Sequence, residues 1–201
     1  MTKAVIFDVG RVLFHWDLRH LFAKLIADEA ELECFVTTVI TPEWHFQHDA
    51  GRPLAEMVAE RIGDYPQHEA LIRAYATRFN ETIPGPVEGM IELVEELDAA
   101  GVPLFVITNF GDDLWQRFRP TQPVFERFRD ILVSGTEKLA KPDPAIYRLA
   151  LERFRLDAGA ALFIDDRDDN IAGAESVGIA GHVFRDAGTT RPWLREQGLP
   201  I

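Results

Sequence analysis

Four groups of polar residues stand at or near the ends of short apolar runs, and their side chains suit them to bind cations and attack electrophilic centres. Carboxylates act as nucleophiles and cation ligands, whereas hydroxyl, amide and ammonium groups bind anionic oxygens. The carboxyl ends of parallel strands meet in one crevice, so groups that are distant in sequence can form one site there. The four groups are Asp8, Thr108 with Asn109, Lys141, and Asp165 with Asp166.

The carboxylates Asp8, Asp165 and Asp166 would repel one another in a crevice of low dielectric constant unless a cation lay among them. Mg²⁺ suits such a site, because it binds a few carboxylate or carbonyl oxygens and keeps water or substrate phosphate in its other positions. Thr108, Asn109 and Lys141 would then bind phosphate oxygens. We therefore expect Asp8 to attack phosphorus and to carry the phosphoryl group.

Each group also has a simpler interpretation when it is taken alone. Asp8 could begin a turn, Thr108 and Asn109 could end a strand, and Lys141 could be a solvated loop residue. The paired aspartates could cap the helix that follows them. The order of all four groups along the chain favours a shared site.

Strands and helices alternate along most of the sequence. The apolar run that ends at Phe7 predicts a first buried strand, and Gly10 then predicts a turn. Strands separated by helices pair in parallel with helices on both faces, so the predicted fold is α/β with a doubly wound, Rossmann-like sheet. Further strands are predicted over residues 102–107, 131–133, 161–164 and 180–184, and helices over 144–154 and 170–177.

The segment after the first strand has helical rather than strand periodicity. Apolar residues recur at helical spacing from about Asp17 to Thr82, and the linker Ile83–Pro86 then stops any helix. This pattern predicts a small all-helical cap inserted after the first strand. The predicted domains are a core formed by residues 1–14 and 84–201 and a cap formed by residues 15–83.

Composition restricts the classes of partner. The 201-residue chain carries a net charge of −12, which opposes binding to nucleic acid or to an anionic membrane. Cys34 is the only cysteine, and no apolar run approaches the roughly 20 residues that span a bilayer. With no charged and apolar leader visible, we expect a cytoplasmic protein whose partner is a small molecule. The sequence does not determine the oligomeric state.

The ordered motifs resemble those of the haloacid dehalogenase superfamily of phosphatases and dehalogenases, and the resemblance spans nearly the whole chain. It implies that Asp8 is the nucleophile, that Thr108 binds phosphate and that Lys141 holds nucleophile and phosphate together. It further implies an Mg²⁺ cofactor and a loop held by Asn170. The motifs are Phe7–Leu13, Ile107–Asn109, Lys141–Pro142 with Tyr147 downstream, and Phe163–Asp166 with Asn170.

The resemblance also implies a set of metal ligands. Asp8 and Asp166 would bind Mg²⁺ directly, and Asp165 would assist directly or through water. The backbone carbonyl of Gly10 would be a further ligand.

Gly10 departs from the usual pattern of the superfamily. Its phosphatases carry a second Asp at this position as the general acid and base, and loss of such a group costs about 10²- to 10⁴-fold in rate. Dehalogenases of the superfamily carry an aromatic residue there. A glycine occurs in members that resemble the bacterial α-glucose-1-phosphatases, whose caps contain a stretch similar to Gln47–Gly51. That likeness implies that His48 binds substrate or replaces the missing acid, whereas Arg11 could bind the leaving group or phosphate, or form a surface ion pair.

The leading hypothesis is an Mg²⁺-dependent phosphatase of small phosphorylated metabolites, with sugar phosphates as the expected substrates and an aspartyl-phosphate intermediate at Asp8. One alternative is a 2-haloacid dehalogenase, in which Asp8 attacks carbon. A second is a weakly active or regulatory protein that binds a phosphorylated ligand.

Overall fold

The central element is a five-stranded parallel sheet with the strand order β3-β2-β1-β4-β5. The computed structural model describes residues 3–201. The first strand occupies the middle of the sheet and is buried along its whole length, which agrees with its continuous apolar sequence. The strands are β1 (Ala4–Phe7), β2 (Leu104–Thr108), β3 (Asp130–Val133), β4 (Ala161–Asp165) and β5 (Ala180–Val183).

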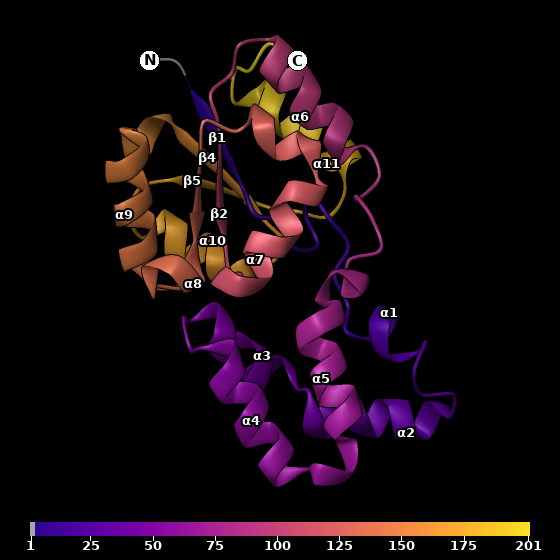
Figure 1. Ribbon diagram of the computed structural model, residues 1–201. Helices are drawn as coiled ribbons and strands as arrows, with labels where there is room; N and C mark the ends of the chain where they lie inside the picture. The colour runs from indigo at the N-terminus through magenta and orange to yellow at the C-terminus, as the bar shows by residue number, and fades with distance from the viewer. Residues whose placement is uncertain (1–2) are drawn as a thin grey trace.

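Helices cover both faces of the sheet (Figure 1). Side chains alternate across a strand, so Val5 and Phe7 pack in one apolar cluster and Ala4 and Ile6 in another. The first cluster includes α6 (Met90–Ala99), α7 (Asp112–Phe118) and α11 (Ala187–Glu196), and the second includes α9 (Pro144–Phe154) and α10 (Asp168–Glu175). The prediction of a doubly wound α/β fold is confirmed. A short helix, α8 (Ser134–Glu137), follows β3.

The predicted boundaries differ from the observed ones mainly at the ends of elements. Strand β2 begins at Leu104 rather than at residue 102, and β4 continues through Asp165. Helix α10 begins at Asp168 rather than at residue 170, and acidic residues such as Asp168 and Asp169 are favourable in a first helical turn. The segment before β3 contains α7, which the sequence showed only as a mixed stretch.

The chain leaves β1 at its carboxyl end and forms a separate group of helices before it returns to α6 (Figure 1). The outgoing and returning segments run side by side: the His15 N–H donates to the Gly85 carbonyl at 3.0 Å and the Asp17 N–H to the Thr82 carbonyl at 3.0 Å. The division into domains at residues 14/15 and 83/84 remains a prediction. The helices are α1 (Arg19–Phe22), α2 (Glu29–Cys34), α3 (Pro42–Asp49), α4 (Leu54–Asp64) and α5 (Glu69–Arg78), which we call the cap helices.

The cap helices contact the part of the chain that contains the sheet, which we call the sheet domain. The contact lies where α3 meets α7 and α8. The hydroxyl of Ser134 donates to the Asp49 carbonyl at 2.6 Å. The ring of His48 lies so close to Gly111 that a Cβ at that position would come within 1.8 Å of a ring carbon. Close contact between the two parts of the chain therefore depends on the absence of a side chain at Gly111.

Within residues 3–201, no helix has both the length and the apolar character that crossing a membrane requires.

Replacement of Gly111 by Ala is expected to destabilise the fold by about 1–3 kcal/mol, because the added methyl group overlaps the His48 ring. Gly63 is the matched control, since it lies in α4 with open space around its Cα and Ala is the better helix former. Urea unfolding should show lower stability for Gly111→Ala and unchanged or higher stability for Gly63→Ala. Equal effects in the two variants would contradict the close contact.

Candidate active site

Lys141 lies at the centre of the candidate site and is almost completely buried. Its Nζ is 2.8 Å from Oδ1 of Asp8 and 2.6 Å from Oδ2 of Asp165. Burial by itself would lower the pKa of Lys141, but the charges and hydrogen bonds of Asp165 and Asp8 outweigh it and raise this pKa. The ammonium therefore stays charged and joins the ends of β1 and β4.

The sheet register explains why these carboxylates meet. Phe7 of β1 lies opposite Ile164 of β4 in the sheet. The next residue on each strand is an aspartate, Asp8 after Phe7 and Asp165 after Ile164. Asp8 extends this alignment, since its N–H donates to the Ile164 carbonyl at 2.9 Å. The two carboxylates thus reach the same edge of the sheet from adjacent strands.

Asn109 holds Lys141 in place. Its Nδ2 donates to the Lys141 carbonyl at 3.0 Å, and its Oδ1 accepts from the Lys141 N–H at 2.9 Å. Both polar atoms of the amide therefore contact the backbone of one residue, which gives Asn109 a positioning role. Asn109 also lines the cavity, and its predicted role in binding substrate stays a prediction.

Asp165 is surrounded by donors. Besides Lys141, its carboxylate accepts from the Arg167 N–H and from Nδ2 of Asn170, both at 2.9 Å onto Oδ1. The Asn170 carbonyl accepts in turn from the Tyr147 hydroxyl at 2.7 Å. These contacts agree with the expectation that Asn170 holds the loop. Both oxygens of Asp165 already accept hydrogen bonds, and its predicted help in binding metal, directly or through water, stays a prediction.

Asp8, Asp165 and Asp166 each offer a carboxylate oxygen, and these oxygens lie within 4.8 Å of one another. Mg²⁺ binds oxygens at about 2.0–2.1 Å, so opposite ligands lie about 4.2 Å apart, which is close to this spacing. The donor set fits Mg²⁺ because it consists of oxygens with excess negative charge. Gly10, predicted as a carbonyl ligand, lines the same cavity.

Burial raises the pKa of Asp8 to about 7, with the charge of Asp165 acting in the same direction and Lys141 and the Val9 N–H opposing it. Burial, with Asp165 again contributing, also raises the pKa of Asp166. Both shifts come mainly from burial, with the neighbouring carboxylate of Asp165 adding to them. Asp8 Oδ1 bonds to Lys141 and to the Val9 N–H, whereas Oδ2 makes no hydrogen bond within residues 3–201.

These groups open onto a cavity of about 450 Å³ between the sheet and the cap helices. Asp8, Lys141 and Asp166 line it from the sheet side. The rest of its wall comes from both parts of the chain and combines polar side chains with an extensive apolar surface. The apolar lining residues are Val9, Phe14, Trp16, Pro42, Phe46, Phe79, Ile83, Phe110 and Pro142.

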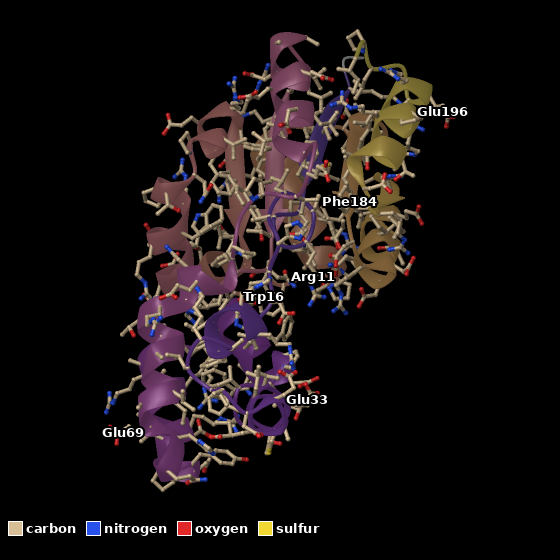
Figure 2. The ribbon with its side chains drawn as sticks, turned by 90° about the vertical axis from the view of Figure 1, so that its right-hand side faces the viewer. Arg11, Trp16, Glu33, Glu69, Phe184 and Glu196 are labelled. Carbon is tan, nitrogen blue, oxygen red and sulfur yellow. The ribbon has the colours of Figure 1, made fainter. Side chains whose placement is uncertain are left out.

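Thr108 and Arg11 occupy contrasting positions. Thr108 is buried at the end of β2, and its hydroxyl has no hydrogen-bond partner in the described chain. Thr108 is not among the residues that line the cavity, but an unpartnered buried hydroxyl at this strand end is compatible with phosphate binding, which stays a prediction. Arg11 is exposed and its guanidinium lies 5.3 Å from the centre of the Trp16 ring, so it stacks at the cavity edge rather than forming an ion pair with any described carboxylate. Figure 2 shows Arg11 and Trp16 where the cap helices meet the sheet domain.

His48 does not line the cavity, contrary to the expectation that it binds substrate. Its Nδ1 is 2.8 Å from the Arg52 carbonyl, and its ring packs on Gly111. His45 and Asp49 on the same helix line the cavity instead. Successive helical residues point about 100° apart, so the sequence motif located the right helix turn but not the residue that faces inward.

His45 and Asp49 form a buried pair that sequence reasoning missed. Nε2 of His45 lies 3.3 Å from Oδ2 of Asp49, and Nδ1 lies 2.6 Å from the hydroxyl of Tyr75. Burial lowers the pKa of His45 to about 4 and raises that of Asp49 to about 7. Their spacing of four residues in a helix was the available signal, but aromatic neighbours made simple packing the preferred interpretation.

The family model of haloacid dehalogenase-like hydrolases matches residues 9–183. The chain belongs to this family. It is therefore a hydrolase, and the geometry around Asp8 and Lys141 is the part of the fold where its chemistry is expected.

Curated relatives include several phosphatases. A sesquiterpene phosphatase of Aspergillus oryzae is 27% identical over 96% of this chain and 95% of its own length. A phosphoglycolate phosphatase of Mesorhizobium japonicum is 29% identical over 71% of this chain and 63% of its own length. The finer likeness to α-glucose-1-phosphatases remains a prediction from the cap motif.

Solved structures share the fold at lower identity. The family enzyme bt-2542 of Bacteroides thetaiotaomicron, in a magnesium complex, superposes with a TM-score of 0.75 at 18% identity, covering 96% of this chain and 98% of its own. An L-2-haloacid dehalogenase of Xanthobacter autotrophicus gives 0.63 at 19% identity, covering 90% of this chain and 76% of its own. At these identities the likeness shows the fold and leaves the reaction open.

Replacement of Lys141 by Met is expected to destabilise the protein by about 3–5 kcal/mol, because it leaves the buried carboxylates of Asp8 and Asp165 without their cation. Lys24→Met is the control, since Lys24 pairs with Glu81 at an exposed position and should change stability little. Urea unfolding near neutral pH measures both. A similar small effect in both variants would show that the buried ion pairs do not hold the site together.

Asp49→Asn is expected to stabilise the fold above about pH 7, by about 2–4 kcal/mol, because a carboxyl with a raised folded-state pKa disfavours folding once it must ionise. The gain should shrink as pH falls from about 7 and vanish well below pH 4, where both the folded and the unfolded state carry the proton. The groups that act on Asp49 are His48, Lys141, the Gly111 N–H, Tyr75 and His45. Urea unfolding of both proteins across this range measures the difference, and a gain that grew toward acid would contradict the assignment.

Proposed function

We propose that this protein is an Mg²⁺-dependent phosphatase that hydrolyses phosphomonoesters through a phosphoryl intermediate on Asp8. The observation that carries the proposal is the buried Lys141, bonded to Asp8 and Asp165 beside Asp166 at one end of a cavity. A carboxylate nucleophile, a fixed ammonium and a set of metal-binding oxygens are the groups that phosphoryl transfer requires. The phosphatase relatives support the same reaction.

Asp8 is the nucleophile in this scheme. Oδ1 of Asp8 accepts from Lys141 and from the Val9 N–H, the latter at 2.7 Å, whereas Oδ2 makes no hydrogen bond in the described chain. One carboxylate oxygen of Asp8 would attack phosphorus while the other would bind the metal. Asp8 and Asp166 would hold Mg²⁺ with the Gly10 carbonyl, and Asp165 would orient the cluster. When bound, the ion would offset the negative charge that gathers on carboxylates and phosphate.

Lys141 and Thr108 would bind the transferring group. An ammonium has three N–H donors, and two of those on Lys141 are directed to carboxylates, which leaves one for a phosphate oxygen. The buried Thr108 hydroxyl is a second unengaged donor at the neighbouring strand end. Asn109 keeps the Lys141 backbone in place while this happens.

The dehalogenase alternative fits this site less well. A 2-haloacid would bring a fourth carboxylate to Asp8, Asp165 and Asp166, whose negative charge Lys141 and Arg11 offset only in part. A phosphomonoester is also an anion, but its reaction would use the metal that the three carboxylates are suited to bind.

The apolar cavity wall favours substrates whose organic part is itself apolar. The sequence suggested sugar phosphates, whose many hydroxyl groups need polar partners, and the aromatic part of the wall around Phe79 and Phe110 provides none. The relative that matches almost the whole chain is named a sesquiterpene phosphatase, which agrees with an apolar leaving group. We therefore propose compact alkyl or aryl phosphates as the substrate class, and a volume of about 450 Å³ limits their size.

The proposal predicts phosphate release that needs both Asp8 and Mg²⁺. Asp8→Asn should lower the rate by at least about 10³-fold, because the amide cannot act as the nucleophile. Removal of metal with a chelator should stop turnover, and added Mg²⁺ should restore it. The assay uses geranyl monophosphate and p-nitrophenyl phosphate against glucose 1-phosphate, with Asp64→Asn as the control because Asp64 is an exposed carboxylate at the end of α4.

Geranyl monophosphate should have a higher kcat/KM than glucose 1-phosphate. A clear preference for glucose 1-phosphate would overturn the substrate class but leave the reaction standing. Full activity without metal, or in Asp8→Asn, would overturn the reaction. Ligand binding without phosphate release from any substrate would favour the regulatory alternative.

A further inference from the structure

The proposed reaction lacks a proton donor on the sheet side of the cavity. Gly10 occupies the place where superfamily phosphatases carry their acid and base, and a glycine has no titratable side chain. An alkoxide leaving group is strongly basic, so its departure from phosphorus needs a proton. Attack of water on the phosphorylated Asp8 needs a base in turn. The following inference rests on the proposed phosphatase function.

Asp49 of α3 is the buried carboxyl group that faces this cavity from the cap helices. It is 5% exposed, and its Oδ1 has no hydrogen-bond partner in the described chain. An unpartnered buried oxygen in a cavity wall is costly, which indicates a position kept for a ligand. The charge of Lys141 acts on Asp49, so this carboxyl lies within electrostatic range of the nucleophile's own partner.

The contacts around Asp49 hold it in one orientation. Its backbone carbonyl accepts from Ser134 Oγ at 2.6 Å, and its Oδ2 lies 3.3 Å from Nε2 of His45. Nδ1 of His45 is 2.6 Å from the Tyr75 hydroxyl, and burial raises the pKa of Tyr75 well above its usual value, so the hydroxyl keeps its proton. The Tyr75 O–H therefore donates to Nδ1, the Nε2–H donates to Oδ2, and Oδ1 remains for substrate.

Other titratable groups in the cavity wall fit the role less well. Both ring nitrogens of His45 are engaged, and its ring is stacked between Trp16 and Phe79. Glu43 and His15 line the cavity but are exposed, so neither is held in a fixed orientation by burial. Asp49 alone among these cavity-lining groups combines burial, fixed orientation and a free oxygen.

We propose that Asp49 is the general acid and base of the reaction, delivered from the cap helices in place of the residue missing at Gly10. In the first step Asp8 attacks phosphorus, the bond from phosphorus to the ester oxygen breaks, and that oxygen takes the proton from Asp49 Oδ1. In the second step Asp49 removes a proton from water, whose oxygen attacks phosphorus. The bond from phosphorus to Asp8 then breaks, which releases inorganic phosphate and restores both carboxyl groups.

The surroundings of Asp49 suit it to this exchange. Burial raises its pKa to about 7, while His48, the Gly111 N–H and Lys141 act in the opposite direction. A general acid and base is most effective when its pKa lies near the working pH. Burial also keeps His45 neutral by lowering its pKa to about 4, so the imidazole orients Asp49 without taking its proton.

Asp49→Asn with two leaving groups tests the assignment. The amide keeps the shape of the carboxyl group but cannot donate or accept the proton. With geranyl monophosphate, which has a basic leaving group, the first turnover should slow by about 10²- to 10⁴-fold. With p-nitrophenyl phosphate, whose leaving group departs unprotonated, the first turnover should stay within about tenfold of the wild-type rate.

The same variant should then stall before the second step. It should release about one p-nitrophenolate per site in a burst, turn over slowly afterwards, and accumulate phosphorylated Asp8 that mass spectrometry detects. The retained burst shows that the variant is folded and binds substrate. Asp64→Asn, the same change at an exposed position of the cap helices, should behave as wild type with both substrates.

Two outcomes would overturn the role of Asp49. In one, Asp49→Asn turns over both substrates at the wild-type rate. In the other, its first turnover slows equally for both leaving groups, which indicates a structural role. Failure of the proposed function is distinguishable from either, because the wild-type protein itself would then release no phosphate with Mg²⁺.

Discussion

The rest of the structure depends on one buried ammonium group. Lys141 binds Asp8 and Asp165 at 2.8 and 2.6 Å, and its charge opposes the effect of burial on the pKa of Asp8. Two parallel strands must end side by side to supply the carboxylates, and Asn109 from a third strand end fixes the Lys141 backbone. Such an arrangement is a poor source of stability, because desolvation of the charges offsets their attraction. Its value lies in holding a nucleophile in a fixed position next to a place for a metal.

The cap helices complete the site with a buried histidine and a buried carboxyl group, whereas the sheet side carries an ammonium paired with carboxylates. On the sheet side Asp8 lies 2.8 Å from the Lys141 ammonium, whereas on the cap side Asp49 lies beside a neutral histidine and has no ion pair with Lys141. Burial raises the pKa of both Asp8 and Asp49 to about 7, so the two carboxyl groups differ in their partners rather than in their pKa values. Asp8 is fixed beside the ammonium and the metal-binding oxygens, which suits it to attack, and Asp49 keeps an unpartnered oxygen, which suits it to proton transfer. The close fit of His48 against Gly111 sets the position of the second group relative to the first.

The α3 helix shows where sequence reasoning reaches its limit. The stretch Gln47–Gly51 indicated that this part of the cap matters, and the helix does border the cavity. The sequence pointed to His48, but its neighbour Asp49 faces the cavity, because rotation of a helix about its axis is determined by packing against other elements. Asn109 shows the same limit on the sheet side. Its position at a strand end was clear, yet both its polar atoms bond to the Lys141 backbone, a contact 32 residues away in the chain.

The sequence by itself determined the order of the strands and of most of the helices between them, the family, and the set of residues that gather at the carboxyl edge of the sheet, whereas α7, α8 and α11 were not predicted. These features follow from periodicity and from parallel topology, which bring strand ends together whatever the details of packing. Only the tertiary structure decided which side chains face the cavity, which are consumed in holding others, and which have shifted pKa values. Those properties depend on burial and on distances of a few ångströms between residues far apart in sequence, and no local pattern encodes them. For that reason Asp8 was visible from the start, whereas the pairing of His45 with Asp49 emerged only in the folded chain.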